Sequence, residues 1–269
     1  IAVAYALAVL ADDSLEHPRL EAVITVDEEV GLLGAKDIDL SMLKGHILLN
    51  IDSEEEGHFL TSCAGGLSAQ TKIPVVYQRE QGIKVSLHLH QLEGGHSGAE
   101  IDKERANGII EMGRILKDNA IPRNVSSSIM ILPEDREAFS SYIAEITEIL
   151  KKEYAISDPN LTLDVQFDKE GSYEVLNPSS LQKVLFYLRN VPNGVMHMST
   201  NIKGLVETSL NAGIMKLNKE ELYISTSVRS SVKSRKEELT DRLVYLTEFL
   251  GGEISIEGDY PAWVILCRL

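Results

Sequence analysis

The feature that most constrains this chain is the stretch Val23–Gly66, where two short apolar runs are each followed by acidic residues. The runs cover Ala22–Val26 and Ile47–Ile51, and the acids are Asp27-Glu28-Glu29 and Asp52. Short aliphatic runs between polar breaks are typical of buried strands. Roughly twenty residues separate the runs, which is enough for a helical crossover, so the two strands are predicted to lie parallel.

The acids after these two runs form a candidate metal site. Ligands of open α/β sheets bind beyond the carboxyl ends of the strands, so Glu28, Glu29 and Asp52 are expected to meet. Converging carboxylates repel one another unless a cation lies among them, and Zn²⁺ accepts Asp and Glu oxygens. The alternative is that both acidic runs are solvated loops, as most acidic runs are.

Three ordered motifs in this stretch resemble a known family. T-x-D-E-E-x-G-x-x-G-A, N-x-D-S-E-E-E-G and C-A-G-G are similar to the aminoacyl-histidine (Xaa-His) dipeptidases, which are carnosinase-type di-zinc exopeptidases. The resemblance implies an α/β fold, with a mostly parallel catalytic sheet and an inserted α+β lid that forms a homodimer contact. It also implies hydrolysis of dipeptides, with Xaa-His favoured, by a metal-activated water. The implied cofactor is a pair of Zn²⁺ ions, with Co²⁺ or Mn²⁺ possible.

The resemblance assigns roles to four residues near these motifs. It makes Glu28 the general base, Glu29 a zinc ligand and Asp52 a ligand of the second metal. An unligated carboxylate beside the activated water suits a base that later protonates the leaving amine. His96, in G-G-H-S-G, resembles a lid histidine that stabilises the oxyanion. A histidine in a Gly-rich turn is otherwise usually a surface residue.

A second polar group resembles the residues that hold the substrate in this family. Its members are Asn201, Glu207, Thr208 and Ser209 in S-T-N-I-K-G-L-V-E-T-S-L-N, and Arg229 in S-V-R-S-S. A guanidinium fork matches a terminal carboxylate geometrically. The alternative for Arg229 is a surface salt bridge.

Hydrophobic periodicity predicts the remaining elements. Gly65-Gly66 is predicted to be a hinge between domains, dividing the chain into residues 1–66 (catalytic, partial), 67–252 (lid and dimerisation) and 253–269 (return to the catalytic domain). A buried helix is predicted over residues 1–12. Further strands are predicted at Ile83–Leu92, Ser126–Leu132, Leu161–Phe167, Leu222–Val228 and Glu253–Glu257. Further helices are predicted at Glu104–Lys117, Asp135–Lys152, Ser179–Leu188 and Lys236–Leu250.

The ends of the chain bear on its activity. The H-x-D motif and the last histidine ligand of the family are not among these 269 residues. The chain is therefore expected to be an internal fragment with impaired activity. Two alternatives stay open: a non-catalytic lid and dimerisation fragment, or a related deacylase or aminopeptidase.

The composition of the chain argues against some kinds of binding partner. The formal net charge of −15 argues against nucleic acid, which needs basic patches. The two cysteines, Cys63 and Cys267, form no disulfide framework, which fits a cytoplasmic location. The longest apolar run, Ile1–Ala11, is too short to span a bilayer, so no membrane partner is expected.

Overall fold

The structure is a computed structural model that describes residues 2–28, 32–51, 57, 62–95, 100–116 and 125–262. The chain divides into two compact units: residues 64–262 form the larger one, and the described residues before Ala64 belong to the smaller one. The larger unit contains all of the segment 67–252 that the sequence assigns to a lid.

The smaller unit contains two helices among its described residues, α1 (Ala2–Ala11) and α2 (Leu33–Asp37). The helix predicted over residues 1–12 is confirmed, but its predicted burial is wrong, because α1 has no buried residue. A carboxylate organises the turn before the second apolar run. Glu21 Oε2 accepts hydrogen bonds from the backbone N–H groups of Lys44 (2.9 Å) and Gly45 (2.8 Å).

The parallel pair of strands predicted for this unit is wrong. Ala22–Val26 and Ile47–Ile51 form no strand, and their aliphatic side chains are largely exposed, with Leu48 at 88%. A strand needs neighbours that satisfy its backbone N–H and C=O groups, and the described residues pair neither run. All strand pairs in the described part of the chain are antiparallel.

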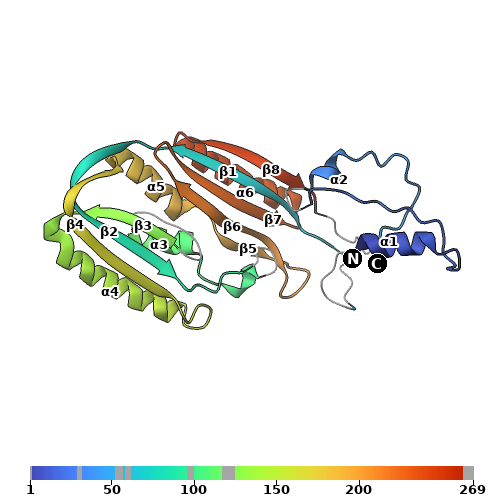
Figure 1. The fold of residues 1–269 in the computed structure, drawn as a ribbon, viewed down its shortest axis with the longest axis horizontal. Coiled ribbons are helices and arrows are strands. Elements are labelled where there is room, and N and C mark those ends of the chain that lie inside the picture. Colours follow the sequence, from blue (N-terminus) through green and yellow to red (C-terminus); the bar gives the residue numbers. More distant parts are fainter. Residues whose placement is uncertain are drawn as a thin grey trace. The chain divides into compact units, whose positions relative to one another are not determined.

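The larger unit consists of two antiparallel sheets with helices (Figure 1). The five-stranded sheet has the order β5-β6-β7-β1-β8 and the three-stranded sheet the order β3-β2-β4. The strands are β1 (Gly65–Pro74), β2 (Tyr77–His90), β3 (Val125–Ile131), β4 (Thr162–Leu176), β5 (Gly194–Met198), β6 (Val206–Leu217), β7 (Glu221–Ser230) and β8 (Glu253–Tyr260). The helices are η1 (Ile101–Lys103), α3 (Gly108–Leu116), η2 (Pro133–Asp135), α4 (Arg136–Glu153), α5 (Pro178–Asn190) and α6 (Lys233–Phe249).

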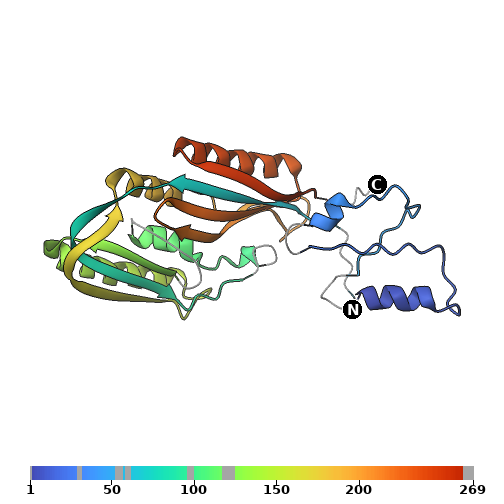
Figure 2. The ribbon, with the colours of Figure 1, turned by 45° about the horizontal axis from the view of Figure 1, so that its top comes forward.

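Alternation along the strands decides which face of the five-stranded sheet is buried. On β7, the even positions from Leu222 to Ser230 are buried and the odd positions are half-buried. The same period on β1 buries Ala69, Thr71 and Ile73. Helix α6 lies along this sheet (Figure 2) and contacts β1, β7 and β8. The opposite face carries polar side chains. The sheet therefore has one buried face and one polar face, as antiparallel sheets commonly do.

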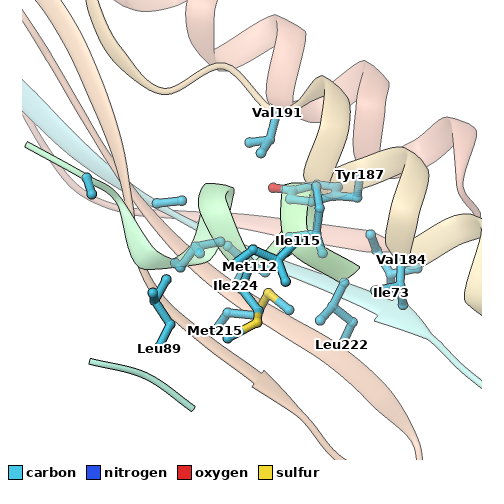
Figure 3. Close-up of a cluster of buried hydrophobic side chains, with 14 of the residues drawn as sticks. Ile73, Leu89, Met112, Ile115, Val184, Tyr187, Val191, Met215, Leu222 and Ile224 are labelled. Atoms are coloured by element: carbon cyan, nitrogen blue, oxygen red, sulfur yellow. The ribbon is translucent and has the colours of Figure 1, made fainter. Parts of the chain in front are cut away.

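One hydrophobic core joins the two sheets. Its centre contains Ile73 of β1, Leu89 of β2, Met112 of α3 and Tyr187 of α5 (Figure 3). Burying each such side chain contributes roughly 1.5–3 kcal/mol. Helix α5 is capped by Asn177, whose Oδ1 accepts a hydrogen bond from Ser180 N at 2.8 Å.

Glu111 is a buried carboxylate where α3 meets α4. Its Oε1 accepts a hydrogen bond from Tyr154 Oη at 2.7 Å, and burial raises the pKa of this carboxyl. Because the folded protein holds the proton more tightly, this group favours folding below its ordinary pKa of 4.5, and that contribution is lost as pH rises through the higher folded pKa. Glu111→Gln is expected to flatten this fall, as measured by urea unfolding between pH 4 and 8.

Glu153 provides a control of opposite sign in the same cluster. The Arg114 guanidinium donates to its carboxylate and holds the pKa of Glu153 below its ordinary value. Its contribution is present above the ordinary pKa and is lost as pH falls through the lower folded pKa. Glu153→Gln should therefore remove the loss of stability that occurs as the pH falls. Identical pH profiles for the two variants would contradict the assignment.

In the described part of the chain, no helix combines the length and the hydrophobicity that a bilayer crossing needs.

Candidate functional site

Asp27 and Glu28, the first two residues of the D-E-E motif, lie in a turn before α2. Gly34 N donates to Val26 O at 3.1 Å and Leu32 N donates to Glu28 O at 3.1 Å. A Cβ at Gly34 would lie 2.6 Å from Val26 O, so the glycine of this motif permits a backbone contact that any side chain would block. Asp27 has a left-handed φ of 57°, and the Glu28 side chain is exposed at the turn.

The other predicted catalytic and metal residues lie outside the described residues. These are Glu29, Asp52 and His96. Within the residues that the structure describes, no group of three or more His, Cys, Asp or Glu side chains has the geometry to hold a metal ion. The meeting of Glu28, Glu29 and Asp52 therefore stays a prediction.

The predicted substrate-binding residues Ser209 and Arg229 do lie side by side. They are direct partners in the ladder between β6 and β7. On the other side of Arg229 the ladder partner is Gly66 of β1, and the partner of Gly66 on β8 is Tyr260. The four residues thus form a row across the end of the sheet at which β1 begins, on the face away from Ala69 and Thr226. We call Ser209, Arg229, Gly66 and Tyr260 the sheet-end row.

Arg229 is the one strong cation of this row. Its side chain is half-buried, and its Nε is buried with no hydrogen-bond partner among the described residues. A buried guanidinium N–H without a partner is costly, so a ligand that accepts its hydrogen bond would be stabilised. The alternative reading of Arg229, a surface salt bridge, has no counterpart among the described ion pairs.

Gly66 and Tyr260 belong to this row but were not among the predicted site residues. A Cβ at Gly66 would lie 2.6 Å from Tyr260 Oη, so the tyrosine ring lies over the glycine beside Arg229. The C-A-G-G motif could have indicated this contact, because paired glycines often mark a close approach of other groups. The sequence predicts a hinge at these glycines. Gly65 and Gly66 are the first two residues of β1, and the division between the two compact units lies just before them, between Cys63 and Ala64.

The remaining predicted residues have different surroundings. The Glu207 carboxylate forms an ion pair with Arg235 and accepts a hydrogen bond from Thr208 Oγ1. Thr208 is fully buried, and its Oγ1 lies 2.8 Å from Ser230 Oγ on the helix-covered face. Asn201 is exposed in the loop between β5 and β6, where its backbone N–H donates to Ser199 Oγ at 3.3 Å. Only Ser209 and Arg229 of this group share the polar face of the sheet.

A cavity of about 530 Å³ lies between the β2–α3 segment and the five-stranded sheet. Its lining includes Gly95, Arg105, Asn107, Asn193 and Asn211. The Asn107 Nδ2 group reaches both asparagines, with distances of 3.1 Å to Asn193 Oδ1 and 3.0 Å to Asn211 Oδ1. The cavity is therefore polar and can accept small hydrogen-bonding ligands.

Comparisons with known proteins agree with the motifs. No protein-family model matches the chain. The chain is 33% identical over 288 residues to the cytosol non-specific dipeptidase of Escherichia coli strain K12, covering 98% of this chain and 58% of that protein. A stretch of 49 residues is 43% identical to the uncharacterized protein YqjE of Bacillus subtilis strain 168, covering 18% of this chain and 13% of that protein.

A solved structure agrees with the sequence match. The crystal structure of aminoacylhistidine dipeptidase from Vibrio alginolyticus matches with a TM-score of 0.83 and 30% identity, over 99% of this chain and 58% of that one. The chain thus spans 58% of the length of each of these two proteins. The chain is a homologue of the cytosol non-specific and aminoacylhistidine dipeptidases.

Proposed function

We propose that this chain supplies part of the active site of a metal-dependent dipeptidase, with Xaa-His dipeptides as preferred substrates. The observation that carries the proposal is the match over nearly the whole chain to two proteins named as dipeptidases. Two observations support it, because a peptidase needs a base and a group that binds its substrate. Glu28 is exposed on a turn that requires glycine at position 34, and the Nε of Arg229 has no hydrogen-bond partner among the described residues.

Two acidic residues would bind the metal. Glu29 and Asp52 would be ligands for Zn²⁺, Co²⁺ or Mn²⁺, and carboxylate oxygens fit all three cations. When bound, such ions polarise the peptide carbonyl and lower the pKa of a water molecule. Glu28 would take the proton from that water and pass it to the leaving amine, and its exposure on the turn leaves it accessible for this role.

Residues of the larger unit would bind the substrate. Arg229 would donate to the terminal carboxylate of the dipeptide, with Ser209 beside it in the sheet-end row. Asn201 would contribute from its exposed loop, while Glu207 and Thr208 would support this end of β6 through the contacts described above. His96 would stabilise the oxyanion that forms when the peptide carbonyl is attacked.

The proposed domain roles follow from the same homology. Residues 1–66 and 253–269 would belong to the catalytic domain, and residues 67–252 would form a lid through which two copies associate in the cytoplasm. The compact unit 64–262 is compatible with such a lid, since it has its own hydrophobic core, although it extends past residue 252 and includes β8, which pairs with β1. Sedimentation of the purified chain tests the association.

Activity is best measured in two forms of the protein. One is the 269-residue chain itself, and the other is a graft in which this chain replaces the matching segment of the E. coli dipeptidase. With Zn²⁺ and β-alanyl-histidine, the graft is expected to turn over substrate within the ordinary enzymatic range of about 1–10³ s⁻¹. The chain alone should show little turnover, because Glu29 and Asp52 are too few ligands for a metal pair.

The graft also separates the proposal from its rivals. A folded graft without dipeptidase activity would contradict the proposed function and favour a non-catalytic lid segment. Preference for N-acyl amino acids over dipeptides would favour a deacylase. The unmodified E. coli dipeptidase, assayed in parallel, serves as the positive control.

A further inference from the structure

The β8 end of the sheet-end row contains a β-bulge, which decides which residue lies opposite Gly66. Ser68 of β1 pairs with Glu257 of β8, so a regular antiparallel ladder would pair Gly66 with Asp259. The partner is Tyr260 instead, because β8 has one extra residue in this interval. The bulge therefore places a phenol in the row where a regular strand would place a carboxylate.

Gly258 and Lys236 stabilise the bulge. Gly258 has a left-handed φ of 60°, which glycine adopts at little cost. Lys236 of α6 is only 6% exposed, and its Nζ donates to Asp259 Oδ1 at 2.5 Å and to Tyr260 O at 2.7 Å. A buried ammonium group needs such acceptors. The charge of Asp259 is thus paired with a lysine of the helix that covers the opposite face of the sheet.

Arg229 is consequently left without an acid in its own row. The other members of the row, Ser209, Gly66 and Tyr260, carry no negative charge. Arg229 also belongs to none of the ion pairs formed among the described residues. A carboxylate at the position of Tyr260 would compete with an anionic ligand for the guanidinium. The bulge therefore keeps this row positively charged.

The Tyr260 ring leans from β8 across β1, towards the strand that carries Arg229. A Cβ at Gly66 would lie 2.6 Å from Tyr260 Oη and 2.8 Å from its Cζ, so the hydroxyl end of the ring lies above Gly66. Strand β1 is the neighbour of β7, and neighbouring strands are about 4.8 Å apart. The hydroxyl and the guanidinium are therefore adjacent on one face, and a carboxylate, with two accepting oxygens, can bridge such a pair of donors.

The Tyr260 hydroxyl differs from that of Tyr223, a tyrosine on the same face of the sheet. Tyr223 Oη donates to Gln70 Oε1, and Gln70 Nε2 donates to Ser68 Oγ at 2.9 Å. Tyr260 Oη forms no hydrogen bond with another described residue. The row thus holds two donors without a partner among the described residues, this hydroxyl and the buried Nε of Arg229. A ligand that accepts from both would be stabilised.

We propose that Tyr260 is a specificity-determining residue, whose hydroxyl donates a second hydrogen bond to the substrate carboxylate that Arg229 binds. The inference rests on the proposed function, which assigns that carboxylate to Arg229. Gly66 supplies the space for the tyrosine, and Lys236 fixes the bulge that turns it to this face. Because hydrogen bonds to a charged acceptor are stronger than neutral ones, the two donors select a free carboxylate over a neutral amide.

The first experiment replaces Tyr260 by phenylalanine in the graft described above. The substitution removes the hydroxyl and keeps the ring. KM for β-alanyl-histidine is expected to rise about tenfold, with kcat nearly unchanged, because one hydrogen bond to a charged group is lost. KM for the dipeptide amide should change little. Tyr223→Phe is the matched control, since its hydroxyl already donates to Gln70, and it should leave KM for both substrates near wild type.

A second experiment moves the tyrosine without changing it. The atoms nearest to a Cβ at Gly66 all belong to the Tyr260 ring, so Gly66→Ala displaces the ring from its place beside Arg229. Gly66→Ala is expected to raise KM for β-alanyl-histidine as much as Tyr260→Phe does. In a Tyr260→Ala background the added methyl group has space, so Gly66→Ala should have no further effect. This double-mutant cycle remains informative if the phenylalanine variant does not fold.

Two results would overturn the inference. One is an equal KM for the dipeptide in folded Tyr260→Phe and Tyr223→Phe grafts. The other is a rise in KM by the same factor for the dipeptide and for its amide, because the hydroxyl would then act only on the structure of the sheet.

Failure of the proposed function is recognised separately. An inactive wild-type graft would count against that function. The 269-residue chain can still be titrated with β-alanyl-histidine and its amide, with the Arg229 Nε–H followed by NMR, because the whole row lies within the unit 64–262. A dissociation constant for the acid about tenfold higher in Tyr260→Phe than in wild type would support the inference. Equal constants, or no binding of the acid to the wild-type chain, would overturn it.

Discussion

Replacing Glu28 by glutamine in the active graft is expected to lower kcat about 10²-fold or more and to leave the metal content unchanged. Glutamine has the same shape but cannot take a proton, and general bases contribute about 10²–10⁴ to the rate. The Glu28 side chain is exposed and its backbone O accepts the Leu32 N–H, so the substitution should not disturb the turn. Steady-state kinetics and elemental analysis measure the two quantities.

Glu29→Gln is the matched variant, one residue further along the sequence. It should weaken metal binding, so that activity recovers in part at high Zn²⁺ concentration. Asp27→Asn serves as a control, because it removes the charge next to Glu28 and because asparagine tolerates the left-handed φ of 57° at this position. Loss of metal in Glu28→Gln together with a dispensable Glu29 would reverse the two roles.

Replacing Arg229 by alanine is expected to raise KM for dipeptides by about 30-fold or more, because removing one partner of a buried charge pair costs about 2–5 kcal/mol. Lysine should restore only part of the affinity, since it lacks the planar fork. The sheet ladder should survive, because the Arg229 side chain projects from the polar face.

A substrate variant provides the control for this prediction. A dipeptide amide lacks the terminal carboxylate, so it should be bound weakly by wild type and should lose little more in Arg229→Ala. If Arg229→Ala raises KM by the same factor for the dipeptide and for its amide, Arg229 does not bind the carboxylate. Ser227→Ala, two residues away on the same face of β7, should leave both substrates nearly unaffected.

The helices and the regular strands were predictable from the sequence because periodicity is local. The predicted helix Asp135–Lys152 is α4, and the predicted strand Leu222–Val228 lies within β7. The helix expected from Glu104 begins at Gly108 instead, because Asn107 caps it and Arg105 is used in the preceding loop.

Elements that depend on distant partners were not predictable. Strand β1 begins with two glycines and has a mixed sequence, and it exists through pairing with β7 and β8, which lie more than 140 residues later. The polar stretch 169–172 continues β4 beyond the predicted end, because an edge strand tolerates polar residues on its open face. The apolar runs of the smaller unit have strand composition but no strand partner among the described residues.

The candidate site likewise has features that local motifs predict and features that depend on distant partners. The motifs name Glu28, Ser209 and Arg229, but only the register of β6, β7, β1 and β8 places Ser209, Arg229, Gly66 and Tyr260 in one row. The burial of Asp158 could not be recognised from the sequence, because a lone aspartate in an S-D-P-N turn is usually a solvated turn residue. Its buried carboxylate accepts hydrogen bonds from the backbone N–H groups of Glu93 and Ala106, more than 50 positions away.

The central claim is that Glu29 and Asp52 are metal ligands, and the metal content of the graft tests it most directly. Elemental analysis after gel filtration is expected to find about two metal ions per wild-type graft, as in two-metal hydrolase sites. Asp52→Ala and Glu29→Ala should each lose metal, whereas Glu54→Ala, in the same acidic run, should keep it. Full metal content in the Asp52→Ala and Glu29→Ala grafts would contradict the account.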